Sequence, residues 1–387
     1  MMENSHERVD SHERVDSHEH KEKEAMSAQL SQVVESSTSA GEVDDALLSV
    51  RDLKVHFQVG RRKADGSHDK VHAVDGVSFD VRRGRTLAIV GESGSGKTTA
   101  ALSIMRLVPA TAGTIQFGDV DLTSLKGEAL RQQRRHFQFV FQDPYSSLNP
   151  RQRAGDIVRM PLNLMNIGTP EERRQKVSEL FRIVGLRDDQ QGLFPHQFSG
   201  GQRQRLNIAR ALATDPQLVV CDEPVSALDI AMQAQILNLL RRIQRERNQS
   251  FLFISHDMAV VEHICDDIAV MYLGQIVEQA PRNAFFSRPL HPYSVALMSA
   301  VPTVNGGREK AARRIKLSGD PPSPINPPAG CRFAGRCPAA QPLCQQTPPS
   351  LREVAPGHQV ACHFVEAKGN QISAPLDGFR AHENVEL

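Results

Sequence analysis

The sequence predicts an α/β fold: a parallel sheet covered by helices, preceded by a smaller antiparallel sheet and followed by a loop-rich segment. Short runs of aliphatic, β-branched and aromatic residues alternate with longer stretches of helical spacing, as expected for strands that are buried on both faces. These runs are Thr86–Val90, Phe137–Phe141, Leu218–Cys221 and Phe251–Ile254. A chain of 387 residues is long enough for two domains at the usual size of about 100 to 200 residues each.

The composition narrows the class of protein. The chain carries 46 Lys and Arg against 45 Asp and Glu, so it has no overall basic field that would attract nucleic acid or acidic lipid. No apolar run reaches the length of about 18 residues that crosses a bilayer, and the start lacks the layout of a secretory signal. We therefore expect a cytosolic chain. Six cysteines, four of them after residue 330, argue for a local thiolate site rather than a disulfide scaffold.

Both ends of the chain are predicted to be tails. Residues 5–10 and 11–16 repeat the hexad Ser-His-Glu-Arg-Val-Asp, and the polar composition continues to about residue 42. Such a segment has too little apolar surface to bury, so residues 1–45 are expected to be disordered. Residues 367–387 are expected to form a second tail.

The antiparallel sheet is expected near the start of the folded part. Apolar residues alternate with polar ones over Leu53–Val59, and a second strand pattern follows over Val77–Val81. A polar turn near Asp65 and Gly66 separates the two strands.

The sheet domain is predicted to span residues 46–285, with a helical insert at about 149–213. In the insert, apolar residues fall at helical spacing and no strand pattern occurs between Asn149 and Pro195. Proline becomes frequent after residue 281, which indicates a separate, loop-rich C-terminal module at residues 286–366.

A phosphate-binding motif follows the first central strand. Residues 91–98 match the pattern G-x-x-x-x-G-K-[ST] between the strand that ends at Val90 and a helix predicted over Thr99–Leu107. In such a loop, backbone N–H groups surround the phosphates, the lysine (Lys97) reaches the β- and γ-phosphates, and the threonine (Thr98) ligates magnesium. The expected ATP-binding residues are Gly91, Ser93, Gly94, Ser95, Gly96, Lys97, Thr98 and Thr99.

An acidic pair stands at the end of another buried strand. Asp222 and Glu223 directly follow the run Leu218–Cys221. Asp222 is expected to orient the magnesium ion, and Glu223 to polarise the attacking water as a general base or water-positioning group. Alone, an Asp-Glu pair is common on protein surfaces; the phosphate-binding motif upstream is what favours catalysis.

The segment Phe198-Ser-Gly-Gly-Gln202 decides between classes of P-loop protein. It resembles the signature of ABC ATPases, normally Leu-Ser-Gly-Gly-Gln, and it opens a helix predicted over Gln202–Ala213 with Ser199 as N-cap. The resemblance implies that this segment closes over the γ-phosphate held by a second subunit, so that ATP is sandwiched between two such domains. The residues that would do so are Ser199, Gly200, Gly201 and Gln202.

Other landmarks of ABC ATPases occur in order over about residues 46–302. The resemblance implies that Gln142 senses the metal and the nucleotide as a third magnesium residue, and that Asp229 touches the partner subunit. His256 resembles the catalytic switch histidine that contacts the γ-phosphate. Phe57 is the candidate for stacking on adenine, with packing in the core as the alternative.

Three further segments resemble one branch of this family. Residues 143–151, the triplet His291-Pro-Tyr293 and the element at residues 330–338 are similar to the second ATPase subunit of oligopeptide, dipeptide and nickel ABC importers, with their HPY-type C-terminal extension. The resemblance implies an ATP hydrolase that uses ATP and Mg²⁺ to drive import of oligopeptides or dipeptides. It also implies a peripheral position on the cytoplasmic face of the inner membrane.

The resemblance implies protein partners as well. These are a second ABC ATPase subunit in a homo- or heterodimer, two membrane permease subunits and, indirectly, an extracytoplasmic solute-binding protein. No nucleic acid partner is expected.

Two alternatives remain open. The same machinery could import another solute, such as glutathione or a nickel chelate, or the chain could be a soluble ABC ATPase that acts on ribosomes or DNA. Against the second, only about 55 residues separate Gln142 from the signature, with no room for a long heptad coiled coil. The chain also has a single phosphate-binding motif, whereas translation-factor ATPases carry two domains.

Four cysteines in the C-terminal segment are predicted to bind a metal, because this proline-rich region has little apolar surface to hold it together. Their spacing, C-x5-C-x6-C-x17-C, lacks the C-x2-C pair usual for zinc and favours a four-iron iron–sulfur cluster, with Zn²⁺ or free thiols as alternatives. Some peptide-importer ATPases hold such a cluster in this extension, so the resemblance agrees. The cysteines are Cys331, Cys337, Cys344 and Cys362; Cys221 and Cys265 are expected in the core.

Overall fold

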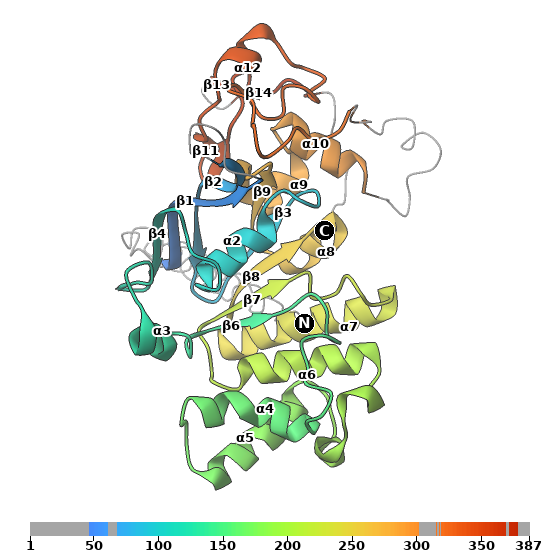
Figure 1. Cartoon of the computed structure of the whole chain (residues 1–387). Helices are drawn as coiled ribbons and strands as arrows, with labels where there is room; N and C mark the ends of the chain where they lie inside the picture. The colour runs from blue at the N-terminus through green and yellow to red at the C-terminus, as the bar shows by residue number, and fades with distance from the viewer. Residues whose placement is uncertain are drawn as a thin grey trace, which may run out of the picture. The chain divides into compact units, whose positions relative to one another are not determined.

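The structure is a computed structural model, shown in Figure 1. It describes residues 46–60, 68–301, 315, 317, 319–368 and 371–377. The predicted N-terminal tail and the predicted turn at Asp65 and Gly66 lie outside the described residues.

An eight-stranded sheet with the order β11-β12-β10-β9-β3-β8-β7-β6 forms the centre of the fold. Its parallel strands are β3 (Thr86–Val90), β6 (Phe137–Val140), β7 (Leu218–Asp222), β8 (Ser250–Ser255) and β9 (Asp267–Tyr272). Every residue of β3 and β8 is buried, because helices or the second sheet cover both faces. The predicted parallel sheet is therefore confirmed, with strand bounds within one residue of the expected runs.

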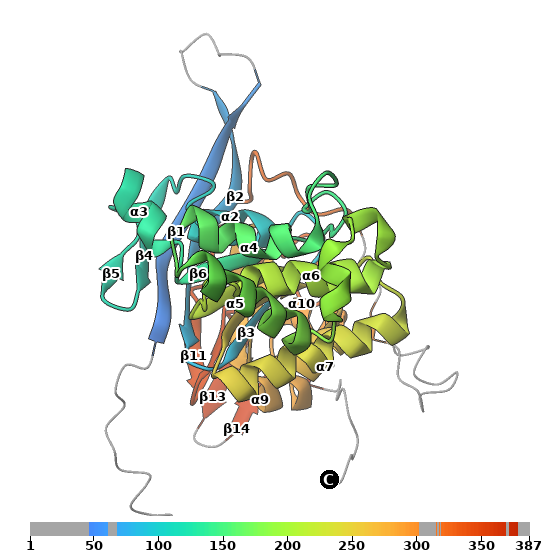
Figure 2. The same cartoon turned by 90° about the horizontal axis from the view of Figure 1, so that it is seen from below.

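The smaller antiparallel sheet has the order β2-β1-β4-β5. Its strands are β1 (Ala46–Val59), β2 (Asp69–Arg82), β4 (Ala112–Phe117) and β5 (Val120–Asp121), followed by the short helix α3 (Gly127–Gln133). Figure 2 shows β1 and β2 as a long twisted ribbon. Leu48, Val50 and Phe79 join the apolar cluster that also contains Leu87 of β3, so this sheet packs directly on the central one.

Helices follow the strands that carry the predicted motifs. They are α2 (Lys97–Ile104), α7 (Ile230–Arg247) and α8 (Met258–Ile264). The region expected as a helical insert holds α4 (Ala154–Leu164), α5 (Pro170–Ile183), two short 3₁₀ turns (Asp188–Gly192 and Pro195–Gln197) and α6 (Gly200–Leu212). In Figure 1 α4 and α5 lie beyond the β6 edge of the sheet. Among the described residues no helix is both long and apolar enough to span a membrane.

The C-terminal segment is not a separate module, contrary to the sequence-based expectation. The segment predicted at residues 286–366 begins within α9 (Arg282–Ser287), after the strand β10 (Gln275–Pro281) of the sheet domain, and contains α10 (Pro292–Ser299), α12 (Pro342–Gln346), β11 (Arg352–Ala355) and β12 (His358–Val360). Strand β12 pairs antiparallel with β10, with Glu278 opposite Val360, so the segment continues the central sheet. The pairing gives hydrogen-bond partners to backbone N–H and C=O groups of β10 that would otherwise be unpaired at the edge of the sheet.

The prediction of a tail from residue 367 onward is wrong for residues 367–368 and 371–377, which the structure describes. Strands β13 (Glu366–Lys368) and β14 (Gln371–Ser373) form a small hairpin. Ile372 packs against the cluster of Leu290 and Val365, and Asp377 pairs with Arg288. The pair of Arg288 and Asp377 joins residues far apart in the sequence, which local composition does not reveal.

His291, at the start of α10, is expected to make the free energy of unfolding depend on pH. Its ring is buried, and its Nδ1 accepts a hydrogen bond from the backbone N–H of Tyr293 at 3.1 Å. Burial lowers the pKa of His291 to about 4, although the nearby Glu278 carboxylate opposes the shift. Between pH 6.5 and 4 the unfolded chain therefore binds a proton at His291 that the folded chain does not.

We therefore expect the free energy of unfolding to fall by about 3 kcal/mol as the pH falls from about 7 to 4, because only the unfolded chain takes up a proton at His291. The value follows from about 1.36 kcal/mol per unit of pKa shift. Denaturant unfolding across this range should show the loss in the unchanged chain. In His291→Asn, whose side-chain oxygen can still accept the Tyr293 N–H, the fall should be smaller by about that amount. An identical pH dependence of both proteins would contradict the prediction.

Candidate functional site

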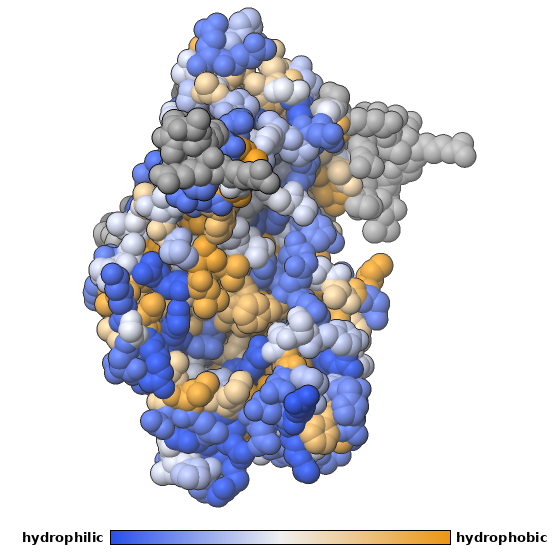
Figure 3. Space-filling model, viewed as in Figure 1, coloured by the Kyte–Doolittle hydropathy of each residue, from blue (hydrophilic) through white to orange (hydrophobic). Residues whose placement is uncertain are grey.

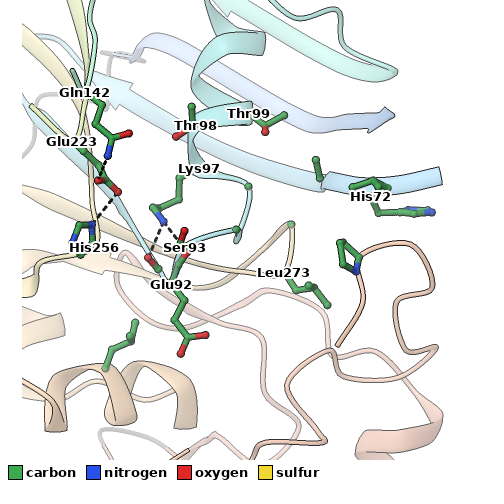
Figure 4. Close-up of a pocket in the computed structure, with 18 residues that line it drawn as sticks. His72, Glu92, Ser93, Lys97, Thr98, Thr99, Gln142, Glu223, His256 and Leu273 are labelled. Atoms are coloured by element: carbon green, nitrogen blue, oxygen red, sulfur yellow. Dashed lines mark hydrogen bonds and ion pairs between the residues drawn. The ribbon is translucent and has the colours of Figure 1, made fainter. Parts of the chain in front are cut away.

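A cavity lies where the phosphate-binding loop meets the ends of the central strands. Its volume is about 710 Å³, within the usual range of about 300 to 1,000 Å³ for ligand sites. The loop and the start of α2 line one side, with Gln142, Glu223 and His256 opposite and β2 residues at the far end. Figure 4 shows these side chains around the hollow.

Two loop positions require glycine because the backbone of neighbouring strands approaches closely. Gly96 has φ 103°, and a Cβ there would stand 2.0 Å from the carbonyl oxygen of Ala73. Gly91 has φ 154°, and a Cβ would stand 2.1 Å from the carbonyl oxygen of Met271. The loop is thereby pressed against β2 and β9, and the helix α2 begins directly after Gly96. This is the geometry in which backbone N–H groups and a helix N-terminus face an anion.

Lys97 points back across the loop. Its ammonium donates to the carbonyl oxygens of Gly91 at 2.8 Å and Glu92 at 2.9 Å (Figure 4). Burial lowers the pKa of Lys97, although the carboxylates of Glu223 and Asp222 oppose this. The ammonium is thus a partly desolvated cation whose hydrogen bonds within the described residues go to oxygens other than carboxylates, so it is well suited to bind phosphate oxygens.

Lys97→Ala is expected to weaken MgATP binding at least about 30-fold, because the phosphates lose a desolvated cation worth about 2 kcal/mol or more. Equilibrium titration with a fluorescent ATP analogue measures the change. Lys126→Ala, at an exposed lysine before α3, is the matched control and should bind normally. Equal affinity of the Lys97 variant and the control would refute the role.

Thr98 and Asp222 lie together as magnesium ligands require. The Thr98 hydroxyl donates a hydrogen bond at 3.1 Å to the carboxylate of Asp222, the last residue of β7. Burial raises the pKa of Asp222, and a bound divalent cation would reverse this by favouring the ionised form. A hydroxyl and a carboxylate are oxygen donors that Mg²⁺ prefers alongside phosphate oxygens and water, so the residues fit the ion.

Glu223 is held between two polar side chains. Gln142 donates to one carboxylate oxygen at 2.8 Å, and His256 Nδ1 lies 3.0 Å from the other (Figure 4). The backbone of Glu223 has φ 45°, a left-handed conformation that is unfavourable for a residue with a Cβ. Strain of this kind persists where the surroundings fix one orientation, and here it directs the carboxylate into the cavity. The predicted group of Gln142, Glu223 and His256 is thus brought together.

The signature segment lies elsewhere. Ser199 caps α6, its hydroxyl accepting from the Gln202 N–H at 3.3 Å, and the Gln202 side chain accepts from the Ser199 N–H at 2.9 Å. The predicted N-cap is confirmed. None of Ser199, Gly200, Gly201 and Gln202 lines the cavity described above. Asp229 caps α7 through the Met232 N–H at 2.8 Å and is exposed.

Phe57 is not among the residues that line the cavity. Its side chain is 41% exposed, so the alternative of core packing is wrong. Phe57 pairs with Val71 across the β1–β2 ladder, and Val71 does line the cavity. Sequence reasoning missed Val71 and His72, which the strand pattern of β2 could have marked as neighbours of Phe57.

The four C-terminal cysteines line one small pocket. The backbone N–H of Cys331 donates to the Cys344 carbonyl at 2.7 Å, which brings two of the segments together. Burial raises the pKa of the Cys337 thiol to about 11. Cys221 and Cys265, in contrast, lie in the apolar core as predicted.

Two family models match the chain. The model described as ABC transporter matches residues 74–226, and the model described as Oligopeptide/dipeptide transporter, C-terminal region, matches residues 277–344. The first match contains the phosphate-binding loop, the signature and the acidic pair. The second contains three of the four cysteines and the residues around His291.

Curated relatives are similar over nearly their whole length. An oligopeptide transport ATP-binding protein, AppF, of Bacillus subtilis is 48% identical over 83% of this chain and 98% of its own. A putative peptide import ATP-binding protein of Brucella ovis is 48% identical over 82% of this chain and 97% of its own.

Solved structures share the fold of the sheet domain. The dimeric ATP-binding cassette MJ0796, in a post-hydrolysis state with ADP and Pi, is 28% identical, with a TM-score of 0.55 over 61% of this chain and 98% of its own. The cbiO1 component of an ABC transporter complex from Clostridium perfringens is 25% identical, with a TM-score of 0.57 over 70% of this chain and all of its own.

Proposed function

The chain belongs to the ABC transporter family, among the oligopeptide and peptide import ATP-binding proteins, and we infer that it couples ATP binding and hydrolysis to the import of short peptides. The observation that carries this conclusion is the pairing of a complete nucleotide site with the C-terminal region of oligopeptide and dipeptide transporters in one chain. A C-terminal region of this kind is expected of a peptide transporter and not of an ATPase that acts on ribosomes or DNA, so import is favoured over that alternative.

The residues of the cavity divide the work of hydrolysis. Lys97 and the loop N–H groups bind the phosphates, while Thr98 and Asp222 would hold Mg²⁺, which would supply charge neutralisation at the phosphate oxygens. Glu223 orients an attacking water and accepts its proton, with Gln142 and His256 fixing the carboxylate.

A second ATPase subunit is needed to complete the site. The signature segment caps its own helix outside the cavity, so it is free to meet nucleotide on another subunit. Asp229 is exposed, and the next residue, Ile230, is 85% exposed, as expected for side chains that a partner covers. The dimer that was solved for the similar cassette MJ0796 supports this arrangement.

Two permease subunits are the proposed membrane partners, with an extracytoplasmic binding protein acting through them on the far side. Figure 3 shows apolar residues gathered across the middle of one face, over α2, above a mostly polar helical part. Phe141 is 40% exposed and Tyr145 is 62% exposed in the stretch between β6 and α4. These side chains support a docking surface for a permease at the cytoplasmic face of the membrane.

Uptake by a deletion strain tests the cargo. Cells that lack this chain should lose uptake of a labelled tripeptide, and the unchanged gene should restore it while Glu223→Gln should not. Nickel and glutathione uptake, measured in the same strains, should be unaffected. Normal peptide uptake together with loss of either other solute would overturn the peptide assignment and leave the ATPase assignment standing.

For the cysteine pocket we propose an iron–sulfur cluster rather than zinc. A tetrahedral zinc with Zn–S bonds of about 2.3 Å places its sulfurs about 3.8 Å apart. No three of the described cysteines have sulfurs that all lie within 4.8 Å of one another. All four nevertheless line the same pocket, a spread that suits the larger cluster better than one ion.

Anaerobic purification tests the cluster. The chain should be brown and hold about four iron atoms with little zinc. Replacing the four pocket cysteines with serine should remove the iron and the visible absorption, whereas Cys265→Ala should keep both. An unchanged chain that is colourless and iron-free after anaerobic purification, or a fourfold variant that keeps its iron, would contradict the proposal.

A further inference from the structure

The C-terminal segment reaches the phosphate-binding loop through one arginine. The two terminal guanidinium nitrogens of Arg336 pair with the two carboxylate oxygens of Glu92, at 2.8 and 3.1 Å. Glu92 is the second residue of the loop and lines the cavity. The side chain of Arg336 is only 9% exposed and that of Glu92 is 31% exposed, so water screens this pair poorly.

A buried tyrosine of the same segment holds the backbone of Glu92. The hydroxyl of Tyr293 accepts the Glu92 N–H at 2.8 Å. Tyr293 is fully buried and packs against the rings of Tyr272 and Phe333, with centroids 4.7 and 5.4 Å away. The position of Glu92 is therefore fixed at both its main chain and its side chain.

A second arginine anchors the segment beside the cavity. Arg332 pairs with Asp75 of β2 and donates to the carbonyl of Leu273 at 2.5 Å. Asp75 also lies 2.9 Å from His56 and 3.4 Å from His72, and one ligand atom from each of the three residues lies within 4.8 Å of the others, close enough to hold a metal ion. Because the guanidinium of Arg332 already supplies a cation to Asp75, we interpret the group as an anchor for the segment.

We propose that Arg336 is a positioning residue for ATP binding, acting through Glu92 on the phosphate-binding loop. A triphosphate brings several negative charges into a cavity that contains the Glu92 carboxylate. Paired with Arg336, that carboxylate is neutralised and held in place. The backbone carbonyl oxygen of Glu92 meanwhile accepts a hydrogen bond from Lys97. Unpaired, the carboxylate would repel the phosphates and compete for Lys97. The proposal rests on the ATPase function but on neither the cargo nor the cysteine cluster.

Nucleotide binding by four proteins tests the proposal: unchanged, Arg336→Ala, Glu92→Gln and the double variant. MgATP should bind Arg336→Ala about tenfold more weakly. The double variant should return to within about twofold of Glu92→Gln, because an arginine is not needed where no carboxylate has to be neutralised. If Arg336 served only to fold the cysteine-containing segment, the double variant would be as weak as Arg336→Ala, and the proposal would be wrong.

Steady-state kinetics distinguish a positioning role of Arg336 from a general loss of folded structure. In Arg336→Ala the KM for ATP should rise about tenfold while kcat at saturating ATP stays within about twofold. Arg288→Ala, which removes an exposed ion pair with Asp377 in the same segment, should leave KM unchanged. If Arg336→Ala does not fold, Arg336→Lys replaces it and should bind with intermediate affinity, since it keeps the charge and loses the two-point contact. Normal KM in a folded Arg336 variant overturns the proposal, whereas failure of the unchanged chain to bind ATP overturns the function itself.

Discussion

Glu223→Gln is expected to bind MgATP with near-normal affinity and to hydrolyse it at least about 100-fold more slowly, since a general base contributes about 10² to 10⁴ in rate. The amide has the shape of the carboxylate but cannot accept a proton from water. Gln142 and His256 each lie within hydrogen-bonding distance of Glu223, so the substituted side chain should stay in place. The loss should therefore fall on the chemical step.

Two measurements check this result. Phosphate release at saturating ATP gives kcat, and size-exclusion chromatography with radiolabelled ATP shows whether the assembled complex accumulates with nucleotide trapped between its ATPase subunits. Glu246→Gln, at an exposed position of α7, is the control and should behave normally. Hydrolysis by Glu223→Gln at the rate of the control would remove Glu223 from the mechanism.

The phosphate-binding half of the site could be predicted because its signals are local. The strand β3 (Thr86–Val90) is a continuous apolar run that ends directly before Gly91, and the loop pattern and helix follow without a gap. Similarly, Asp222 ends the buried strand β7, so that its position at the carboxyl edge of the sheet follows from the strand. Here the sequence neighbours are also the neighbours in space.

The contribution of the C-terminal segment could not be predicted in this way. Arg336 and Glu92 are 244 residues apart, and their pairing depends on how the segment packs against the sheet. Strand β12 (His358–Val360) is only three residues long, too short for an alternating pattern, and it exists because β10 offers an edge to pair with. Composition correctly indicated loops but wrongly suggested that they form a separate unit.

The exposure of Phe57 could not be predicted from the sequence either. Period-two spacing places it with Leu53 and Val55 on one predicted face, yet those two are buried while Phe57 is 41% exposed. Register shifts in the β1–β2 ladder lie between Leu53 and Phe57, and an irregular register changes which way a side chain faces. Sequence spacing alone does not show such a shift.

Ser199→Arg is the second prediction with a large expected effect. Ser199 is exposed and lies outside the cavity of its own subunit, so the variant should bind ATP within about twofold of normal. In the proposed sandwich, however, this residue faces the nucleotide of the opposite subunit, where a long side chain would block closure. Hydrolysis should fall at least about 100-fold, as when groups that contact the reacting phosphate are displaced.

The helix cap has to be separated from this effect. Arginine also removes the hydroxyl that accepts from Gln202 N–H, at a cost of about 1 kcal/mol to the helix. Ser199→Ala loses the same cap without adding bulk, and Ser199→Thr keeps it, so both serve as controls for thermal stability and ATP affinity. In complexes that pair one Ser199→Arg subunit with an unchanged partner, the lost site should be the one whose phosphate-binding loop belongs to the partner. Loss confined to the variant's own phosphate-binding loop would show that the signature serves its own subunit and that the sandwich is wrong.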